Sequence, residues 1–441
     1  MKVAIVGLGK IGLPLAVQLA DRYHVVGADI DPGVVASVRD SRPPFPAEHD
    51  LDRRLAEVVA AGRLDATTDT TAAVAASEVV VVVVPLYTGP TGAPEFSAID
   101  AATAAIGAGL RKGTLVSYET TVPVGSTRDR FGRDLAEASG LTPGDGFSLV
   151  FSPERVSSGR VFADLARYPK LVGGIDERSA RWAVRFYADG LTFDPRPDLP
   201  RPNGVWDLGS AEAAEFAKLA ETTYRDVNIG LANQFARYAD QLGVDFSAIV
   251  EACNSQPFSH LHRPGIAVGG HCIPVYPWFY LDGDPDATIV LAARTVNEAM
   301  PGYCIELLAE AYGDLTGAVV VVLGASYRGG VKETAFSGVF PTVAALRARG
   351  ARPLVHDPLY RDDELESLGL VPYRFGRDGT VDAAVVQADH AEYQALTDAD
   401  LPGVRVVLDG RDILDPARWP HCQVVTVGRG GAKPGNYVIH S

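Results

Sequence analysis

Residues 2–12 read KVAIVGLGKIG, an apolar run of the kind that forms a buried β-strand, followed at once by a glycine-rich turn. Such a run is typical of a parallel strand that feeds a tight loop. Gly7, Gly9 and Gly12 have the G-x-G-x-x-G spacing. The first glycine permits the turn, the second lets the backbone approach a pyrophosphate, and the third allows close packing of helix on strand. This stretch predicts the first βα unit of a dinucleotide-binding domain.

The next strand-like run identifies the expected dinucleotide. Residues 24–31 read HVVGADID, so that Asp29 ends the run and Asp31 follows closely. An acidic side chain at this position accepts hydrogen bonds from the ribose hydroxyls of NAD and repels the extra phosphate of NADP. The sequence therefore predicts NAD as the cofactor. FAD, or an α/β domain with an unused glycine turn, is the alternative.

Strand-like and helical stretches alternate along much of the chain and predict an α/β fold with two doubly wound, Rossmann-like domains. The larger domain continues through residues 78–86, 113–120 and 147–154. A second set of buried runs begins with AVVVVLGASYRGG at residues 318–330 and predicts a smaller α/β domain. Its further strands are expected at residues 352–358, 383–390 and 404–411.

A stretch of different composition separates the two sets of strands. Residues 209–242 are strong helix formers with almost no breakers, so we expect one long helix that links the domains and supplies an oligomer contact. The proline-rich residues 194–204 mark a boundary before it. The predicted division is 1–203 for the NAD-binding domain, 204–312 for a central helical dimerisation region and 313–441 for the C-terminal domain.

Composition excludes several classes of protein. The 40 basic and 55 acidic residues among 441 give a formal charge of −15, which disfavours nucleic acid and anionic membranes as partners. No run has the roughly 18 apolar residues of a membrane span, and the N-terminus is predicted to be a strand rather than a signal peptide. The four cysteines fit no zinc spacing, so we expect no metal site and predict reduced thiols in a cytoplasmic protein.

One cysteine lies in a setting that suits chemistry. Cys272 is part of GIAVGGHCIPVYPWF at residues 265–279, where the preceding glycines leave backbone N–H groups free as donors. It is the candidate nucleophile, with a packing role as the alternative; Cys253, Cys304 and Cys422 are expected to be packing residues. Three kinds of residue at strand ends or in the long helix are candidates for polar roles: Lys218, Glu154, and the pair Thr120 and Thr121.

Several motifs together resemble one known family. They are GLGKIGLPLA (7–16), ETTVPVGST (119–127), SPERV (152–156), AKLAETTYRDVNIGLAN (217–233) and VGGHCI (268–273). Their order is that of the UDP-glucose/GDP-mannose dehydrogenase superfamily, and they look most like the UDP-N-acetylmannosamine dehydrogenase branch. The resemblance implies an NAD-binding N-terminal domain, a central region carrying the catalytic lysine and cysteine loop, and a C-terminal domain that binds the nucleotide diphosphate.

The chemistry implied by the resemblance is a four-electron oxidation of a sugar C6 alcohol to a carboxylate through a cysteine-bound thiohemiacetal and thioester. Carried over by position, Cys272 is the nucleophile, Lys218 stabilises oxyanions, Glu154 handles protons and water, and Thr121 positions that water. The implied cofactor-binding residues are Gly7, Gly9, Lys10, Ile11, Gly12, Asp29, Asp31, Pro85 and Thr120. The implied substrate-binding residues are Arg155, Arg225, Phe258, Arg263, Gly269, Gly270 and Arg328.

The sequence departs from the family pattern in four places. Thr222 replaces an asparagine one turn after the lysine, and Tyr276 replaces an aspartate four residues after the cysteine. Phe258 replaces an arginine upstream of the cysteine loop, and Ala335 replaces an arginine in VKETAFSG. A fifth difference is Arg328 in place of a lysine, which keeps a charge suited to phosphate. Thr222 and Tyr276 are predicted to rebuild a hydroxyl network within the catalytic site.

The predicted function is therefore NAD-dependent oxidation of a nucleotide sugar, with UDP as the expected nucleotide, by a homodimer. The alternatives are a variant that stops at an aldehyde or keto sugar, a single-step alcohol or hydroxy-acid dehydrogenase, and a non-catalytic nucleotide-sugar binding protein. The sugar stays open, as does the pathway, whether for surface polysaccharide or for a secondary metabolite.

Overall fold

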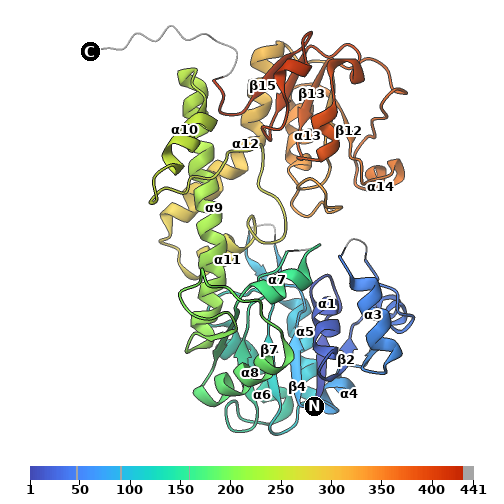
Figure 1. Ribbon diagram of the computed structural model, residues 1–441, viewed down its shortest axis with the longest axis vertical. Helices are drawn as coiled ribbons and strands as arrows, with labels where there is room; N and C mark the ends of the chain where they lie inside the picture. The colour runs from blue at the N-terminus through green and yellow to red at the C-terminus, as the bar shows by residue number, and fades with distance from the viewer. Residues whose placement is uncertain (46–47, 90–91, 158, 431–441) are drawn as a thin grey trace. The chain divides into compact units, whose positions relative to one another are not determined.

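A computed structural model of the chain describes residues 1–45, 48–89, 92–157 and 159–430. The predicted end of the third domain, residues 431–441, lies outside this part. The chain forms two compact units, Met1–Glu221 with Trp278–Asp284 and Thr222–Pro277 with Pro285–Ser441. Each unit contains one large, mainly parallel sheet among its described residues, with helices packed against it (Figure 1). The predicted fold class, with two Rossmann-like domains and a long central helix, is confirmed.

Within the described residues, the sheet of the first unit has eight strands in the order β10-β9-β8-β7-β4-β1-β2-β3. All neighbours pair in parallel except β8 and β9, which are antiparallel, with Phe151 opposite Gly173. The strands are β1 (Lys2–Val6), β2 (His24–Ala28), β3 (Leu64–Thr67), β4 (Val79–Val82), β7 (Leu115–Tyr118), β8 (Ser148–Phe151), β9 (Lys170–Gly174) and β10 (Val205–Asp207).

Helices bury both faces of this sheet, which explains why its central strands are continuous apolar runs. All four residues of β4, VVVV, are buried. The helices are α1 (Gly12–Ala20), α2 (Pro32–Arg39), α3 (Leu51–Ala60), α4 (Thr70–Ala75), α5 (Ser97–Gly109), the π-helix η1 (Ser126–Phe131), α6 (Gly132–Ser139), α7 (Val161–Arg167) and α8 (Glu177–Gly190). A short hairpin, β5 (Tyr87–Thr88) and β6 (Pro94–Glu95), follows β4.

The second unit contains a five-stranded parallel sheet in the order β12-β11-β13-β14-β15, again counting only described residues. Its strands are β11 (Val319–Leu323), β12 (Arg352–His356), β13 (Ala383–Val386), β14 (Val406–Asp409) and β15 (Gln423–Thr426). Its helices are α10 (Phe246–Asn254), α12 (Thr288–Tyr312), α13 (Val339–Ala348), α14 (Asp362–Ser367) and the 3-10 turns η2 (Ala391–Ala395), η3 (Asp398–Asp400) and η4 (Pro416–Arg418).

Two helices contain residues of both units, α9 (Ala211–Leu242) and α11 (Tyr276–Gly283). The structure confirms the predicted long helix, which begins two residues after the expected start. Its one internal glycine, Gly230, packs against α12, since an added Cβ would lie 2.9 Å from the Cβ of Ala293. Close helix packing thus compensates for the weak helix propensity of glycine at this point.

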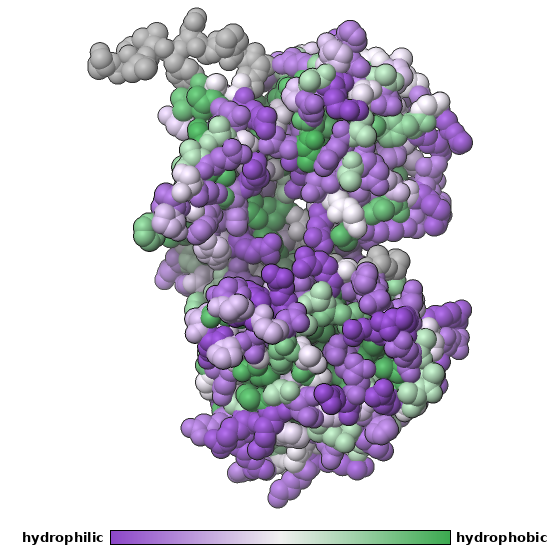
Figure 2. All heavy atoms as spheres, in the orientation of Figure 1, coloured by the Kyte–Doolittle hydropathy of each residue, from purple (hydrophilic) through white to green (hydrophobic). Residues whose placement is uncertain are grey.

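On the face shown in Figure 2, hydrophilic side chains predominate and apolar ones are scattered among them. None of the helices in the described residues combines the length and the apolar character that a membrane crossing requires.

Candidate active site

The three positions of the first turn require glycine for different reasons. Gly7 has φ +95°, and a Cβ there would lie 2.8 Å from the carbonyl oxygen of Val83. A Cβ on Gly12 would lie 1.9 Å from the carbonyl oxygen of Gly7. Nothing lies within 4 Å of a Cβ built on Gly9. The fold therefore needs Gly7 and Gly12, whereas Gly9 leaves an open backbone face of the kind that a pyrophosphate occupies.

The acidic residues after β2 hold this turn in place. One carboxylate oxygen of Asp29 accepts a hydrogen bond from the Leu8 N–H at 2.8 Å, and the other accepts from the Asp31 N–H at 3.0 Å. Asp31 caps α2 by accepting from the Gly33 N–H at 2.7 Å. Asp29 is thus fixed at the carboxyl end of β2, where ribose hydroxyls bind in such domains.

The other predicted cofactor residues surround the same sheet edge. Lys10 and Ile11 are half-buried at the start of α1, and Pro85 is exposed just after β4. The Thr120 hydroxyl donates to the carbonyl oxygen of Val84 at 2.6 Å and so joins the segments that follow β4 and β7. The roles of these residues toward NAD stay predictions.

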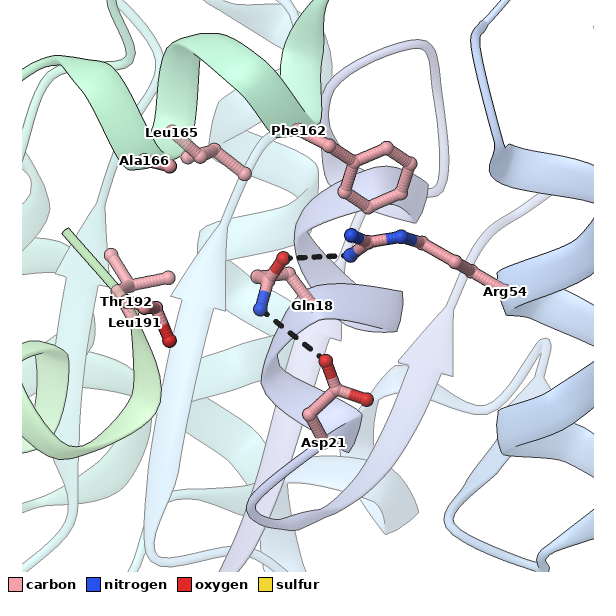
Figure 3. Close-up of a pocket in the computed structure, with 8 residues that line it drawn as sticks. All are labelled: Gln18, Asp21, Arg54, Phe162, Leu165, Ala166, Leu191 and Thr192. Carbon is pink, nitrogen blue, oxygen red and sulfur yellow. Dashed lines mark hydrogen bonds between the residues drawn. The ribbon is translucent and has the colours of Figure 1, made fainter. Parts of the chain in front are cut away.

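A surface pocket of about 320 Å³ lies elsewhere in this unit, beside the last turn of α1 (Figure 3). Arg54 donates to the Gln18 amide oxygen at 3.0 Å and stacks 4.3 Å from the centroid of the Phe162 ring. Because α1 begins at the glycine turn and the pocket lies at its opposite end, this pocket is not the dinucleotide site. Its lining residues are Gln18, Asp21, Arg54, Phe162, Leu165, Ala166, Leu191 and Thr192.

Thr121 and Glu154 leave the sheet side by side. Tyr118 at the end of β7 is opposite Phe151 at the end of β8, so the segments that follow these strands emerge at the same edge. The Glu154 N–H donates to the carbonyl oxygen of Glu119 at 3.2 Å, which ties the two segments together. Thr121 is buried, with 4% of its surface exposed.

Two charged residues that were not among the sequence predictions, Glu119 and Lys170, form a cluster with Glu154. The Lys170 ammonium donates to Glu119 at 2.7 Å and to Glu154 at 3.1 Å. The Tyr187 hydroxyl donates to the second oxygen of Glu119 at 2.6 Å. We call Glu119, Glu154 and Lys170 the Glu–Lys cluster. The position of Glu119 beside Thr120 at a strand end is a signal in the sequence, but nothing there indicates Lys170, which lies 16 residues beyond Glu154.

Electrostatics separate the two carboxyl groups. Burial raises the pKa of Glu119 to about 7, with the Glu154 charge adding to the rise and the Lys170 charge opposing it. Burial also acts to raise the pKa of Glu154, but the Lys170 charge and the Arg155 N–H outweigh it and hold that pKa below its usual range. Glu154 is thus the ionised carboxylate of the pair near neutral pH.

The first turns of α9 carry the predicted lysine into the same neighbourhood. Glu215 accepts from the N–H groups of Gly125 at 2.6 Å and Thr127 at 2.8 Å, just after the Thr121 segment. Glu221 accepts from the Arg155 guanidinium at 2.8 Å. Lys218, which is 6% exposed, lies on the helix between these anchors and shares their face. Arg155 thus forms an ion pair with Glu221, and its contact with substrate stays a prediction.

In the second unit, the Cys272 loop packs tightly against the connection between β11 and α13. The Gly270 N–H donates to the carbonyl oxygen of Ala335 at 2.9 Å. A Cβ on Gly269 would lie 2.7 Å from that of Tyr327, and Gly270, at φ +93°, would place one 3.1 Å from the Tyr327 ring. The two glycines are therefore required by close approach, and they fix the half-buried Cys272 two residues later.

The loop leads directly into α11. The carbonyl oxygen of Cys272 accepts from the Tyr276 N–H at 2.9 Å, so Tyr276 follows the thiol by one helical turn. Beside the loop, His271 lies 3.4 Å from the Glu333 carboxylate. The half-buried Arg328 lies with its guanidinium 5.7 Å from the centroid of the Tyr327 ring. Arg328, Gly269 and Gly270 thus share one neighbourhood.

Other predicted substrate residues lie on the surface of the second unit. Phe258 is 92% exposed, and Arg225 is exposed on α9. Arg263 is 3.7 Å from Glu251 and 3.8 Å from Asp412. Thr222, by contrast, is buried on α9 with 3% of its surface exposed. Their predicted roles toward substrate stay predictions.

A second missed network fixes the start of the cysteine loop. Arg294 on α12 donates to the Asp226 carboxylate at 2.7 Å, and the Asn297 amide donates to the same oxygen at 2.8 Å. Asn233 donates to Asn297 at 2.8 Å and accepts from the Gly265 N–H at 2.9 Å. This buried chain of polar groups links α9 and α12 to the first residue of the loop.

Comparisons with known proteins agree with these features. Residues 1–190 match the NAD binding domain of the UDP-glucose/GDP-mannose dehydrogenase family, residues 212–299 its central domain and residues 321–416 its UDP binding domain. The UDP-N-acetyl-D-mannosamine dehydrogenase of Pyrococcus horikoshii is 34% identical over 94% of this chain and 96% of its own. The NDP-N-acetyl-D-galactosaminuronic acid dehydrogenase of Ralstonia solanacearum is 30% identical over 94% of this chain and 97% of its own.

Solved structures give the same result. The UDP-D-ManNAc dehydrogenase from Pyrococcus horikoshii superposes with a TM-score of 0.86 at 31% identity, covering 98% of this chain and 100% of that chain. The UDP-N-acetyl-mannosamine dehydrogenase from Staphylococcus aureus superposes with a TM-score of 0.84 at 26% identity, covering 97% of this chain and 99% of that chain. The predictions of the family and of NAD are confirmed. The chain belongs to the UDP-glucose/GDP-mannose dehydrogenase family and is an NAD-dependent nucleotide-sugar dehydrogenase, an oxidoreductase.

Proposed function

We propose that the protein oxidises the C6 hydroxyl of a UDP-linked sugar to a carboxylate through a thioester on Cys272. The observation that carries this proposal is the cysteine loop. Two glycines pack it against Tyr327, and a half-buried thiol follows them one turn before Tyr276. A nucleophile on a rigid loop can capture an aldehyde carbon before the aldehyde escapes.

Cys272 and Lys218 act in the first half of the reaction, the two oxidations. When bound, NAD supplies the acceptor for the hydride that leaves C6 in each of two oxidations. After the first, the Cys272 sulfur bonds to the aldehyde carbon, and the carbonyl oxygen takes up a proton to give a thiohemiacetal. The Lys218 ammonium stabilises the negative charge that develops on this oxygen. Loss of the remaining C6 hydrogen with its electron pair, and of the hydroxyl proton, leaves a thioester.

Hydrolysis completes the reaction. The Glu154 carboxylate accepts a proton from water as the water oxygen bonds to the acyl carbon, and Thr121 positions this water. The carbon–sulfur bond breaks, and its electron pair leaves with Cys272. The Lys170 charge favours the ionised form of Glu154, which is the form that can accept this proton.

The names of the relatives favour an N-acetylated sugar. The proteins from Pyrococcus horikoshii and Ralstonia solanacearum are named for N-acetyl-mannosamine and N-acetyl-galactosamine derivatives. We propose a UDP-linked N-acetylhexosamine as substrate, with Arg328 contributing positive charge toward its diphosphate. Tyr276 and Thr222, where the family has charged or amide side chains, supply hydroxyl groups instead. The product would feed polysaccharide synthesis in the cytoplasm.

The test is the stoichiometry of NADH release with UDP-N-acetylmannosamine, UDP-N-acetylgalactosamine, UDP-N-acetylglucosamine and UDP-glucose, with products identified by mass. We expect two NADH per sugar and a carboxylate product. Cys272→Ala should lose at least about 10³-fold in turnover, because it removes the nucleophile. Cys253→Ala, at another half-buried thiol, is the control and should keep full activity.

Each other outcome identifies an alternative. One NADH per sugar would mean an enzyme that stops at an aldehyde or keto sugar. Full turnover by Cys272→Ala would mean a single-step dehydrogenase, and tight sugar binding without NAD reduction would mean a binding protein.

We also propose that the protein is a homodimer through α9. Four large apolar side chains with helical spacing form an exposed stripe on this helix, which we call the α9 stripe. Its members are Tyr224 (55% exposed), Leu231 (41%), Phe235 (41%) and Tyr238 (58%). Because soluble proteins rarely expose such a contiguous apolar row, a second copy of the same stripe is its proposed partner.

A further inference from the structure

We propose that Lys170 is a positioning residue for thioester hydrolysis, which holds the Glu154 carboxylate ionised and fixed while Glu119 carries the proton that the pair shares. This inference rests on the proposed function, because it assigns how the base of the last step is prepared. Neither Lys170 nor Glu119 touches the reacting atoms; both act through Glu154.

The topology of the sheet explains how Lys170 reaches this place. Strand β9 runs antiparallel to β8, with Phe151 opposite Gly173 and Val150 opposite Gly174. Its first residue, Lys170, therefore lies beyond the carboxyl end of β8, where Glu154 emerges. In an all-parallel sheet, the first residue of β9 would lie at the opposite edge. The reversed strand thus delivers a cation to the edge at which catalytic groups gather.

Exposure differs sharply among the three side chains. Glu119 is 0% exposed and Lys170 is 4% exposed, whereas Glu154 is 12% exposed. Only Glu154 is thus placed to meet a water molecule. Two carboxyl groups and one ammonium group leave one negative charge in excess if all are ionised, so a buried cluster of this kind favours retention of one proton.

The complete burial of Glu119 places that proton on it, against the hydrogen bonds that its two oxygens accept from Tyr187 and Lys170. Glu119 is sealed from solvent, and the Tyr187 hydroxyl from α8 and the Lys170 ammonium from β9 are its hydrogen-bond partners. Glu154 faces Lys170 and Glu119, and its other oxygen accepts from the Arg155 N–H at 2.7 Å. The raised pKa of Glu119 and the lowered pKa of Glu154 agree with this distribution.

Stability does not account for the cluster. The free energy lost when three charged groups leave water exceeds the free energy that a typical buried ion pair gains. Apolar side chains would therefore stabilise the fold equally well if the role were only structural. Ionisable groups whose pKa values diverge within one buried cluster are characteristic of acid–base sites. In the hydrolysis step, an ionised Glu154 takes one proton from water, the new carbon–oxygen bond replaces the carbon–sulfur bond, and the electron pair of the broken bond leaves on Cys272.

The kinetic test uses three variants of full-length enzyme. In Lys170→Met, loss of the cation should raise the pKa of Glu154 and move the acid limb of the kcat–pH profile up by about one to two pH units. At neutral pH the first-turnover NADH burst should persist, kcat should fall at least about tenfold, and mass spectrometry should show acylated Cys272. Glu119→Gln, which mimics the protonated acid, and Lys170→Arg, which keeps the cation, should each leave the limb within about half a unit.

Lys112→Met, at an exposed lysine of the same unit, controls for loss of a positive charge and should change nothing. A merely structural Lys170 would lower the thermal stability of Lys170→Met without moving its limb. An unchanged limb in folded Lys170→Met, or a limb moved down by more than about one unit in folded Glu119→Gln, would overturn the inference.

A second measurement separates this inference from the proposed function. A ¹³C NMR titration of side-chain carboxyl-labelled glutamate in wild-type protein, assigned with Glu119→Gln and Glu154→Gln, reads the two ionisations without turnover. We expect Glu154 to be ionised throughout pH 5–8 and Glu119 to titrate near neutrality. The reverse order would overturn the inference even in an active enzyme. The expected order in a protein that makes no thioester would leave the charge assignment standing and contradict only the proposed function.

Discussion

At the scale of single residues, the glycine turn offers a matched pair of substitutions. Gly9→Ala places a methyl group where no protein atom lies within 4 Å, so it should leave the melting temperature unchanged within about 1 °C. Because that space is where a pyrophosphate approaches, the Kd for NAD should rise at least about tenfold. Gly12→Ala would bring its Cβ to 1.9 Å from the Gly7 carbonyl oxygen and should lower the melting temperature by several degrees or abolish folding.

Calorimetry and NADH fluorescence titration measure both effects. Equal loss of stability in the two variants would contradict the distinction between a glycine required by the fold and one required by the ligand.

Motifs in the sequence indicated residues that lie close together in the chain. They could not indicate residues that meet only when strands distant in the chain come together in the sheet. Gly269, Gly270 and Cys272 are close in the chain, and their spacing alone indicates a tight loop beside a thiol. Glu119 and Lys170 are 51 residues apart and meet only because β7 and β9 lie on either side of β8 in the sheet. A buried lysine at the start of a strand has no local signature, since its partners lie on other elements.

At the scale of elements, the sequence predicted several buried strands, and it did not predict the reversal of one of them. A continuous apolar run such as VVVV in β4 indicates burial on both faces, which is typical of parallel sheets. The run KLVGG of β9 has the same texture but lies antiparallel to β8. Side-chain burial does not depend on strand direction, so the pattern could not show the reversal that brings Lys170 to the edge where Glu154 emerges.

Helix α9 carries the prediction that belongs to this scale. A charge at Leu231, within the α9 stripe, should prevent burial of the stripe against a second copy. Leu231→Glu should therefore behave as a monomer in light scattering coupled to size exclusion, at concentrations where the wild type is a dimer. Gln241→Glu, at an exposed position outside the stripe on the same helix, is the control and should remain dimeric. A dimeric Leu231→Glu protein would exclude the stripe as the interface.

At the scale of the whole molecule, pH should change stability through Glu215. Burial raises its pKa to about 7 in the folded protein, against backbone hydrogen bonds that lower it, and the unfolded value is 4.5. The folded state therefore binds more protons between these values, so the stabilising contribution is complete below about pH 4.5 and is lost as pH rises through 7. At about 1.4 kcal/mol per pKa unit, the loss is on the order of 3 kcal/mol.

Two glutamine variants on one helix should show opposite dependences on pH. Glu215→Gln removes the titration, so its unfolding free energy relative to wild type should rise by about 2–3 kcal/mol between pH 5 and pH 8 in urea titrations. Glu212 is the matched control one turn earlier, because a hydrogen bond from Arg128 lowers its pKa from 4.5. The stability that ionised Glu212 contributes is present above pH 4.5 and is lost as pH falls. Glu212→Gln should therefore lower the free energy of unfolding at pH 8, and this difference from wild type should disappear on acidification. Parallel curves for the two variants would mean that the buried carboxyl of Glu215 does not govern this pH range.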